Sequence, residues 1–162
     1  MFFSVSLYCI CVRKWGIVVV FLGTFEHSID PKNRLTLPAV WRKLLDDKVI
    51  ISISSDNCIE IRTIEAYKAY TDTLLKLDTK KEMNRRIQRT IFSNSSEIQI
   101  DSANRILLPA SLINLAKIKK SVVMFGVVDK IEIWNLDEYT SEKRSSDVKN
   151  LNQELEGLSS NE

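Results

Sequence analysis

Aliphatic side chains recur with a period of two in two separate stretches of the chain, residues 34–37 and 105–108. This period is typical of a β-strand that buries one face. Leu or Ile occupies the second and fourth positions of each stretch, so the arginine that opens it, Arg34 or Arg105, is expected on the outer face. A proline that suits the beginning of a helix follows each stretch, so we expect a short helix next, over 39–45 in the first case.

Both stretches belong to a longer internal repeat. Residues 29–39, Ile-Asp-Pro-Lys-Asn-Arg-Leu-Thr-Leu-Pro-Ala, return 71 positions later at 100–110 as Ile-Asp-Ser-Ala-Asn-Arg-Ile-Leu-Leu-Pro-Ala. The similarity extends to three further pairs: 49–51 with 121–123, 59–61 with 131–133, and Tyr67 with Tyr139. Each half is therefore predicted to form strand, tight turn, strand, short helix, strand, strand and helix. Two such units are expected to pack on each other in an α+β fold.

Two helices are predicted between the halves from apolar residues at helical spacing, which are Tyr67, Tyr70, Leu74 and Leu77 in the first and Met83, Ile87 and Ile91 in the second. We expect these stripes to be core or helix-packing faces. Arg85, Arg86 and Arg89 lie off the second stripe. They are interpreted as a solvated helix face, with nucleic-acid contact as the alternative.

Each polar residue of the repeated turn suits one requirement of the turn geometry. Asp30 and Asp101 can accept hydrogen bonds from the amides two residues ahead, which makes an Asx-turn. Asn33 and Asn104 stand where the chain needs a positive φ, which Asn tolerates better than other side chains except Gly. All four residues are predicted to shape the turn, and the two aspartates are assigned that structural role alone.

The arginines that leave the two turns are the candidate binding residues. A planar guanidinium that a rigid turn presents suits phosphate groups and guanine edges, so Arg34 and Arg105 are predicted to contact an anionic partner. A local ion pair with the aspartate of the same turn is the competing interpretation, although a surface pair contributes only about 0 to 1 kcal/mol. Lys32 has no basic counterpart in the second turn, where Ala103 stands. The first loop is therefore expected to bind anions more strongly.

The charge distribution and the cysteine and histidine content limit which binding partners and functions are expected. The net charge is +2, but residues 141–162 hold five acidic and three basic side chains, so residues 1–140 carry +4, a mild preference for anionic partners. The three cysteines and one histidine have no zinc-ligand spacing, so no metal or cofactor is predicted. Cys58 is interpreted as a small buried hydrophobe. His27 aligns with Ile98, which indicates a half-buried position rather than catalysis, and we predict that the protein is not an enzyme.

The chain is divided into four parts. Residues 1–19 form an apolar leader, in which the charged pair at 13–14 interrupts a stretch otherwise long enough for a membrane span. We interpret the leader as a start-site artefact, with translation beginning at one of the valines at 18–20. Residues 20–93 are the first repeat with its connecting helices, 94–140 the second repeat, and 141–162 a polar tail.

The segment from Phe21 to Ala39 strongly resembles the opening of the bacterial MraZ family, whose halves each resemble an AbrB-type DNA-binding unit with an Asp-x-x-x-Arg signature. The second signature matches at Asp101 to Arg105, and residues 131–134 resemble the late strand of the family. The resemblance covers about Val20 to Tyr139 and supports a start near Val20. Members of the family usually carry Gly where Asn33 and Asn104 stand here.

The resemblance implies a pseudo-two-fold, interleaved β-barrel with peripheral helices. It further implies a cytoplasmic, nucleoid-associated regulator of the division and cell-wall gene cluster that forms homo-oligomeric rings and does not enter the membrane. Double-stranded DNA is the expected partner, bound by Arg34 and Arg105 with Lys32, Asn33 and Asn104 beside them. A ring implies direct repeats in the operator, upstream of the protein's own operon. The alternative is an antitoxin-like interaction module on the same barrel.

Overall fold

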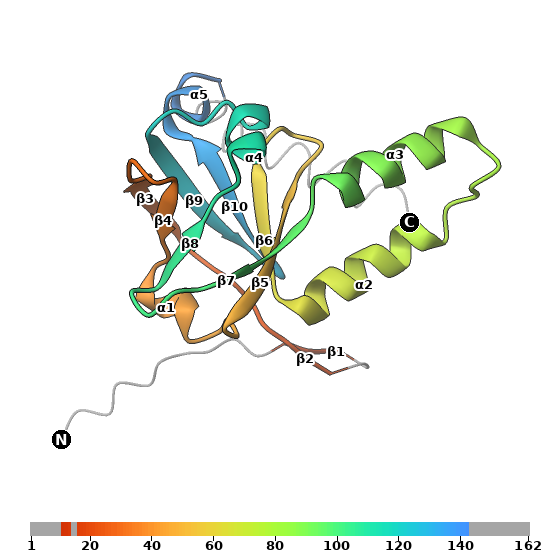
Figure 1. Cartoon of the computed structure of the whole chain (residues 1–162). Coiled ribbons are helices and arrows are strands. Elements are labelled where there is room, and N and C mark those ends of the chain that lie inside the picture. Colours follow the sequence, from red (N-terminus) through yellow and green to blue (C-terminus); the bar gives the residue numbers. More distant parts are fainter. Residues whose placement is uncertain (1–10, 14–15, 143–162) are drawn as a thin grey trace, which may run out of the picture.

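The computed structural model describes residues 11–13 and 16–142, and their elements occur in a repeated order (Figure 1). A leading hairpin and the first half comprise β1 (Cys11–Arg13), β2 (Gly16–Val18), β3 (Thr24–Ser28), β4 (Arg34–Thr36), α1 (Ala39–Arg42), β5 (Lys48–Ile53), β6 (Ile59–Arg62), α2 (Ile64–Leu75) and α3 (Glu82–Ser93). The second half comprises β7 (Ser96–Gln99), β8 (Arg105–Leu107), α4 (Ala110–Leu115), β9 (Ser121–Val127), β10 (Lys130–Asn135) and α5 (Leu136–Glu142). The predicted sequence of elements is confirmed in both halves.

The two halves exchange strands within one antiparallel sheet of order β3-β9-β10-β6-β5-β7. The first half supplies β3 to pair with β9 of the second half, and the second half supplies β7 to pair with β5 of the first. The registers correspond, since His27 pairs with Val122 on one side and Ile98 with Val49 on the other. Neither half therefore forms the complete sheet by itself.

The same registers correct the sequence alignment of the halves by one residue. Val49 corresponds to Val122 rather than to Ser121, and the side chains of both valines are fully buried. The reason is that α4 is two residues longer than α1, whereas the alignment allowed for one extra residue. A shorter β9–β10 turn then restores the register at Ile131, which corresponds to Ile59.

A separate ribbon of β4 and β8 crosses the sheet, and the closed barrel is not confirmed. The edge strands β3 and β7 are not paired with each other, so the described sheet is open. The Asp30 side chain accepts hydrogen bonds from the amides of Lys32 and Arg34, and β4 pairs with β8 while β3 pairs with β9. The coarser prediction of a mixed α+β fold with a largely antiparallel sheet is confirmed.

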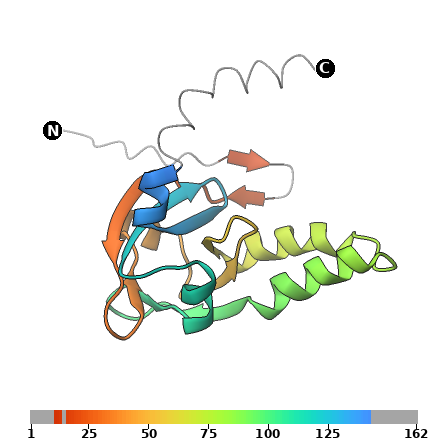
Figure 2. The same ribbon diagram turned by 90° about the horizontal axis from the view of Figure 1, so that it is seen from above.

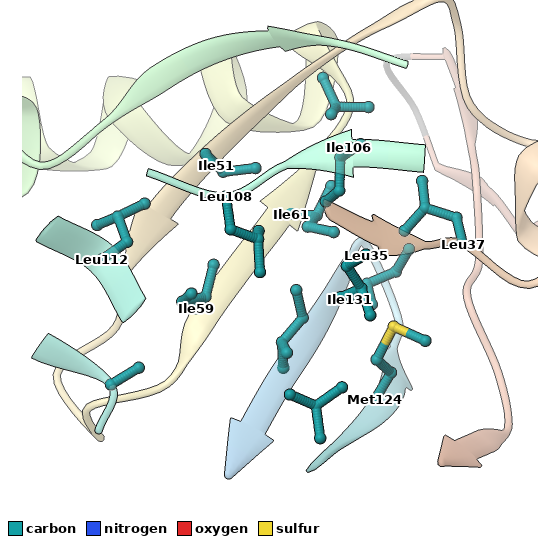
Figure 3. Packing of buried hydrophobic residues seen from close by; sticks show 14 of the residues in the cluster. Leu35, Leu37, Ile51, Ile59, Ile61, Ile106, Leu108, Leu112, Met124 and Ile131 are labelled. Carbon is teal, nitrogen blue, oxygen red and sulfur yellow. The ribbon is translucent and has the colours of Figure 1, made fainter. Parts of the chain in front are cut away.

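The hydrophobic core lies between the ribbon and the sheet (Figure 3). Leu35 and Ile106, which pair at the centre of the ribbon, have no exposed side-chain surface. They point toward the buried residues Ile61, Ile131 and Met124 of the sheet. This packing fixes which face of the ribbon turns outward, because successive residues of a strand point to opposite sides.

Helices α2 and α3 extend from the sheet as an antiparallel arm (Figures 1 and 2). Thr63 caps α2, since its Oγ1 accepts a hydrogen bond from the Ala66 amide at 3.1 Å. The two predicted helices are confirmed, but the prediction that their apolar stripes are core or packing faces is wrong for Met83 and Ile87, which are 64% and 37% exposed. No residue of either helix is buried, and Leu77 lies beyond the end of α2. Among the described residues, none of the helices has the length and apolarity needed to cross a membrane.

The predicted leader and tail fall largely outside the described residues. Within the leader, β1 and β2 pair as an antiparallel hairpin. The start-site interpretation of residues 1–19 stays a prediction, as do the boundaries at 20–93 and 94–140. Of the tail 141–162, the backbone of the last two residues of α5 is described.

Candidate nucleic-acid interface

The first loop is organised by the carboxylate of Asp30. Its Oδ1 accepts hydrogen bonds from the amides of Lys32 at 2.8 Å and Arg34 at 2.9 Å, and its Oδ2 accepts one from Arg34 Nε at 2.6 Å. The backbone closes the same turn, because the Asn33 amide donates to the Asp30 carbonyl at 2.9 Å. Asn33 has a φ of 60°. The predicted Asx-turn and the predicted left-handed asparagine are both confirmed.

The second loop repeats this arrangement atom for atom. Asp101 Oδ1 accepts from the amides of Ala103 at 2.8 Å and Arg105 at 2.9 Å, and Oδ2 accepts from Arg105 Nε at 2.8 Å. Asn104 has a φ of 59°. The duplicated residues therefore produce a duplicated loop, in which Ala103 takes the place of Lys32.

Each loop arginine forms an ion pair with the aspartate of its own turn, as the competing interpretation expected. The side chains of Arg34 and Arg105 remain 32% and 33% exposed, so the pairs lie at the surface. A guanidinium has five N–H donors, and a carboxylate that holds its Nε edge fixes its direction while leaving donors for a second acceptor. The ion pair and the binding role are therefore compatible, with the aspartate acting as a positioning residue.

Hydrogen bonding holds the loop carboxyls in their ionised form. The hydrogen bond from the Arg34 amide lowers the pKa of Asp30 most, and desolvation opposes it by a smaller amount. The hydrogen bonds from the Arg34 side chain and the Lys32 amide lower the pKa further. The pKa of Asp101 is lowered in the same way by the amide and side chain of Arg105. Both carboxylates consequently accept hydrogen bonds throughout the neutral pH range.

The ribbon brings the two arginines onto one outward face. Arg34 pairs directly with Leu107, and Arg105 pairs directly with Thr36, so the arginines are diagonal neighbours. Diagonal Cα atoms in an antiparallel pair are about 7–8 Å apart. The alternation in each strand predicted an outer face for its arginine, but it did not predict that the two strands pair. The signal that could have indicated this pairing is that both strands have the same period-two alternation, with aliphatic residues expected to be buried at the same two positions.

The asparagines tie the two loops together through their backbones. The Asn33 carbonyl accepts a hydrogen bond from the Leu108 amide at 2.9 Å, and the Asn104 carbonyl accepts one from the Leu37 amide at 2.8 Å. Lys32 lies exposed at the tip of its loop. Contact of Lys32, Asn33 and Asn104 with DNA stays a prediction.

The remaining candidates from the sequence lie outside the ribbon of β4 and β8. His27 is half-buried in β3, as its alignment with Ile98 predicted. Arg85 on α3 donates from Nη1 to the carbonyls of Thr79 and Lys80, both at 2.8 Å, so it supports the turn between α2 and α3. Cys58 is fully buried, and burial raises the pKa of its thiol to about 12, which fits the prediction of a small buried hydrophobe.

Comparison with known proteins gives the family. A family model described as "MraZ protein, putative antitoxin-like" matches residues 20–90 and again 91–156. A protein named Transcriptional regulator MraZ from Mycoplasmoides gallisepticum is 41% identical over 120 residues, which cover 74% of this chain and 84% of the relative. Proteins of the same name from Mesoplasma florum and Alkaliphilus metalliredigens are 37% and 35% identical, over 75% and 74% of this chain and 84% of each relative. The chain belongs to the MraZ family.

Proposed function

We propose that this protein is a sequence-specific DNA-binding regulator of transcription that holds double-stranded DNA with its two Asp-x-x-x-Arg loops. The observation that carries the proposal is the pair of oriented guanidinium groups, Arg34 and Arg105, on the outer face of one two-stranded ribbon. Arginine in a fixed direction matches phosphate oxygens and the O6 and N7 acceptors of guanine. The relatives named as transcriptional regulators support the regulatory role.

Lys32 adds a charge beside Arg34, and the backbones of Asn33 and Asn104 keep both arginines in register. The expected target is the DNA upstream of the protein's own operon, the division and cell-wall cluster. The protein acts there in the cytoplasm, associated with the nucleoid. Membership in the family and the interleaving of the two halves support these assignments and an AbrB-type relationship of each half.

We also propose that several subunits form a ring, which sets the arrangement of the operator. Subunits joined head to tail meet DNA in the same orientation, whereas a two-fold dimer favours inverted half-sites. Footprinting of the upstream DNA is therefore expected to protect direct repeats at regular spacing. Protection of a lone palindrome would contradict the ring.

Alanine substitution of the loop arginines tests the proposal. We expect Arg34→Ala to lower affinity for the upstream DNA about tenfold or more, and Arg105→Ala to lower it less, because Lys32 lies beside Arg34 alone. A gel-shift titration over a salt series measures both effects. For each phosphate that a variant no longer neutralises, the slope of log affinity against log salt should become less negative by about 0.9.

Arg89→Ala is the matched control, since it removes the same charge from an exposed position on α3. We expect it to leave affinity for the upstream DNA within about twofold of the wild type, because surface charges away from the DNA add little. Equal binding by the wild type, Arg34→Ala and Arg105→Ala across the salt series would overturn the proposed site. Failure of the wild type to bind any DNA would overturn the function and favour the antitoxin-like alternative.

A further inference from the structure

Leu107 is an exposed aliphatic side chain on the outward face of the ribbon, at the end of β8. It pairs directly with Arg34, and 56% of its surface is accessible. A single exposed leucine is ordinary on a protein surface. Its position is informative here, because the other outward side chains of the ribbon are Arg34, Thr36 and Arg105.

The internal repeat makes Leu107 the main difference between the two halves of this face. The corresponding residue in the first strand is Thr36, which pairs directly with Arg105. One arginine is therefore paired with an isobutyl group and the other with a small side chain that carries a methyl and a hydroxyl. The buried positions between them, Leu35 and Ile106, are nearly equivalent, so packing does not require this difference.

The major groove of DNA is wide enough for a two-stranded ribbon, and it presents one apolar group, the C5-methyl of thymine. Arginine is suited to the guanine acceptors of the same groove, and an aliphatic side chain is suited to the thymine methyl. We infer that Leu107 contacts a thymine C5-methyl group in the major groove, beside the base or phosphate that Arg34 holds. This inference rests on the proposed function and adds a base preference to it.

Deoxyuridine tests the contact, because it differs from thymidine only by that methyl group. The DNA upstream of the gene is amplified once with dTTP and once with dUTP, and the full chain is titrated against both fragments at one salt concentration. We expect the wild type to bind the uracil DNA about three- to fivefold more weakly, the reduction expected for one buried methyl group. Leu107→Ser, which removes the aliphatic group and keeps a small side chain, is expected to bind both fragments with the weaker affinity.

Thr36→Leu is the matched variant, since it gives the ribbon a second leucine at the corresponding position. It should keep the preference of the wild type for thymine DNA. Equal binding of the two fragments by the wild type would overturn the inference while leaving the proposed function intact. The same preference in Leu107→Ser as in the wild type would also overturn it, because the thymine methyl would then act elsewhere or through DNA shape.

Two further outcomes distinguish a contact with DNA from a contact between subunits. A change in the mass of the assembly in light scattering for Leu107→Ser, with its thymine preference retained, would show that Leu107 contacts another copy of the chain and would overturn the inference. Failure of the wild type to bind either fragment would overturn the proposed function, and the inference with it. Arg34→Ala, by contrast, should weaken binding to both fragments and keep their ratio.

Discussion

Replacing Glu60 with alanine is expected to lower the free energy of unfolding by about 3 to 5 kcal/mol, because it leaves the buried Arg62 guanidinium without its carboxylate. Glu60 and Arg62 are 4% and 5% exposed. Glu60 Oε2 accepts from Arg62 Nη1, and Oε1 accepts from Lys130 Nζ at 2.5 Å. Urea denaturation at pH 7, compared with the wild type, measures the decrease in stability.

Arg62 has few other groups that could compensate its buried charge if Glu60 were removed. Its Nε has no hydrogen-bond partner among the described residues, and its guanidinium lies over the ring of Tyr70 at 4.3 Å from the centroid. A cation over an aromatic face gains about 0.5 to 2 kcal/mol, which does not compensate for the removal of a buried carboxylate. The control is the double variant Glu60→Leu with Arg62→Met, which removes both charges and should recover most of the stability. A double variant as unstable as Glu60→Ala would show that an unpaired charge is not the cause.

The lowered pKa of Glu60 determines how acid changes the stability that this carboxylate contributes. Burial alone would raise the pKa of Glu60, but hydrogen bonds from Lys130 and Arg62 outweigh burial and lower it. A carboxyl with a lowered pKa in the folded state contributes stability above its unfolded pKa, and this contribution is lost as pH falls through the folded pKa. The difference in stability between the wild type and Glu60→Ala should therefore shrink in acid. A difference that is constant from pH 7 to pH 3 would contradict this.

The chemistry of the loops was predictable from sequence, since it depends on residues within five positions. Asp30 and Arg34 are close enough in the chain that the turn determines their contact, and the same holds for Asp101 and Arg105. The pairing of β4 with β8 depends instead on contacts between residues about 70 positions apart. Period-two alternation predicts a strand and its buried face, but it does not select the partner strand.

The charged cluster could not be predicted from the repeat, because it departs from the symmetry of the two halves. Glu60 and Glu132 correspond to each other and are directly paired between β6 and β10, an unfavourable arrangement for like charges. Their compensating cations, Arg62 and Lys130, do not correspond, since the equivalent positions hold Trp134 and Cys58. Lys130 Nζ lies 2.8 Å from Glu132 Oε1, so it serves both glutamates.

Gly126 of β9 is a second position at which the two halves differ, and substituting it is expected to lower the stability of the fold strongly. Replacing Gly126 with alanine is expected to destabilise the fold by about 3 kcal/mol, the upper part of the usual range for overpacking. A Cβ there would lie 2.4 Å from both the Leu22 nitrogen and the Phe21 carbonyl carbon, which are backbone atoms that cannot rotate away. The corresponding position in β5 is Ile53, so the glycine is required only where residues 21–22 cross the strand.

The structural change in Gly126→Ala should be detected at Trp41, because Trp41 contacts residues 21–22, which the new methyl group would displace. Trp41 Nε1 donates to the Leu22 carbonyl at 2.9 Å, and the ring of Phe21 packs edge-on against it at 6.4 Å. In a background with Trp15 and Trp134 replaced by phenylalanine, Gly126→Ala should shift the Trp41 emission to longer wavelength and lower the urea midpoint. The control is Gly23→Ala, at a φ of 98° but with its nearest contact 3.4 Å away at the Phe25 ring, where about 1 to 2 kcal/mol is expected. A smaller destabilisation for Gly126→Ala than for Gly23→Ala would contradict the role of the backbone contact, because the strain of a positive φ at Gly23 is expected to cost less than a methyl group placed against backbone atoms at Gly126.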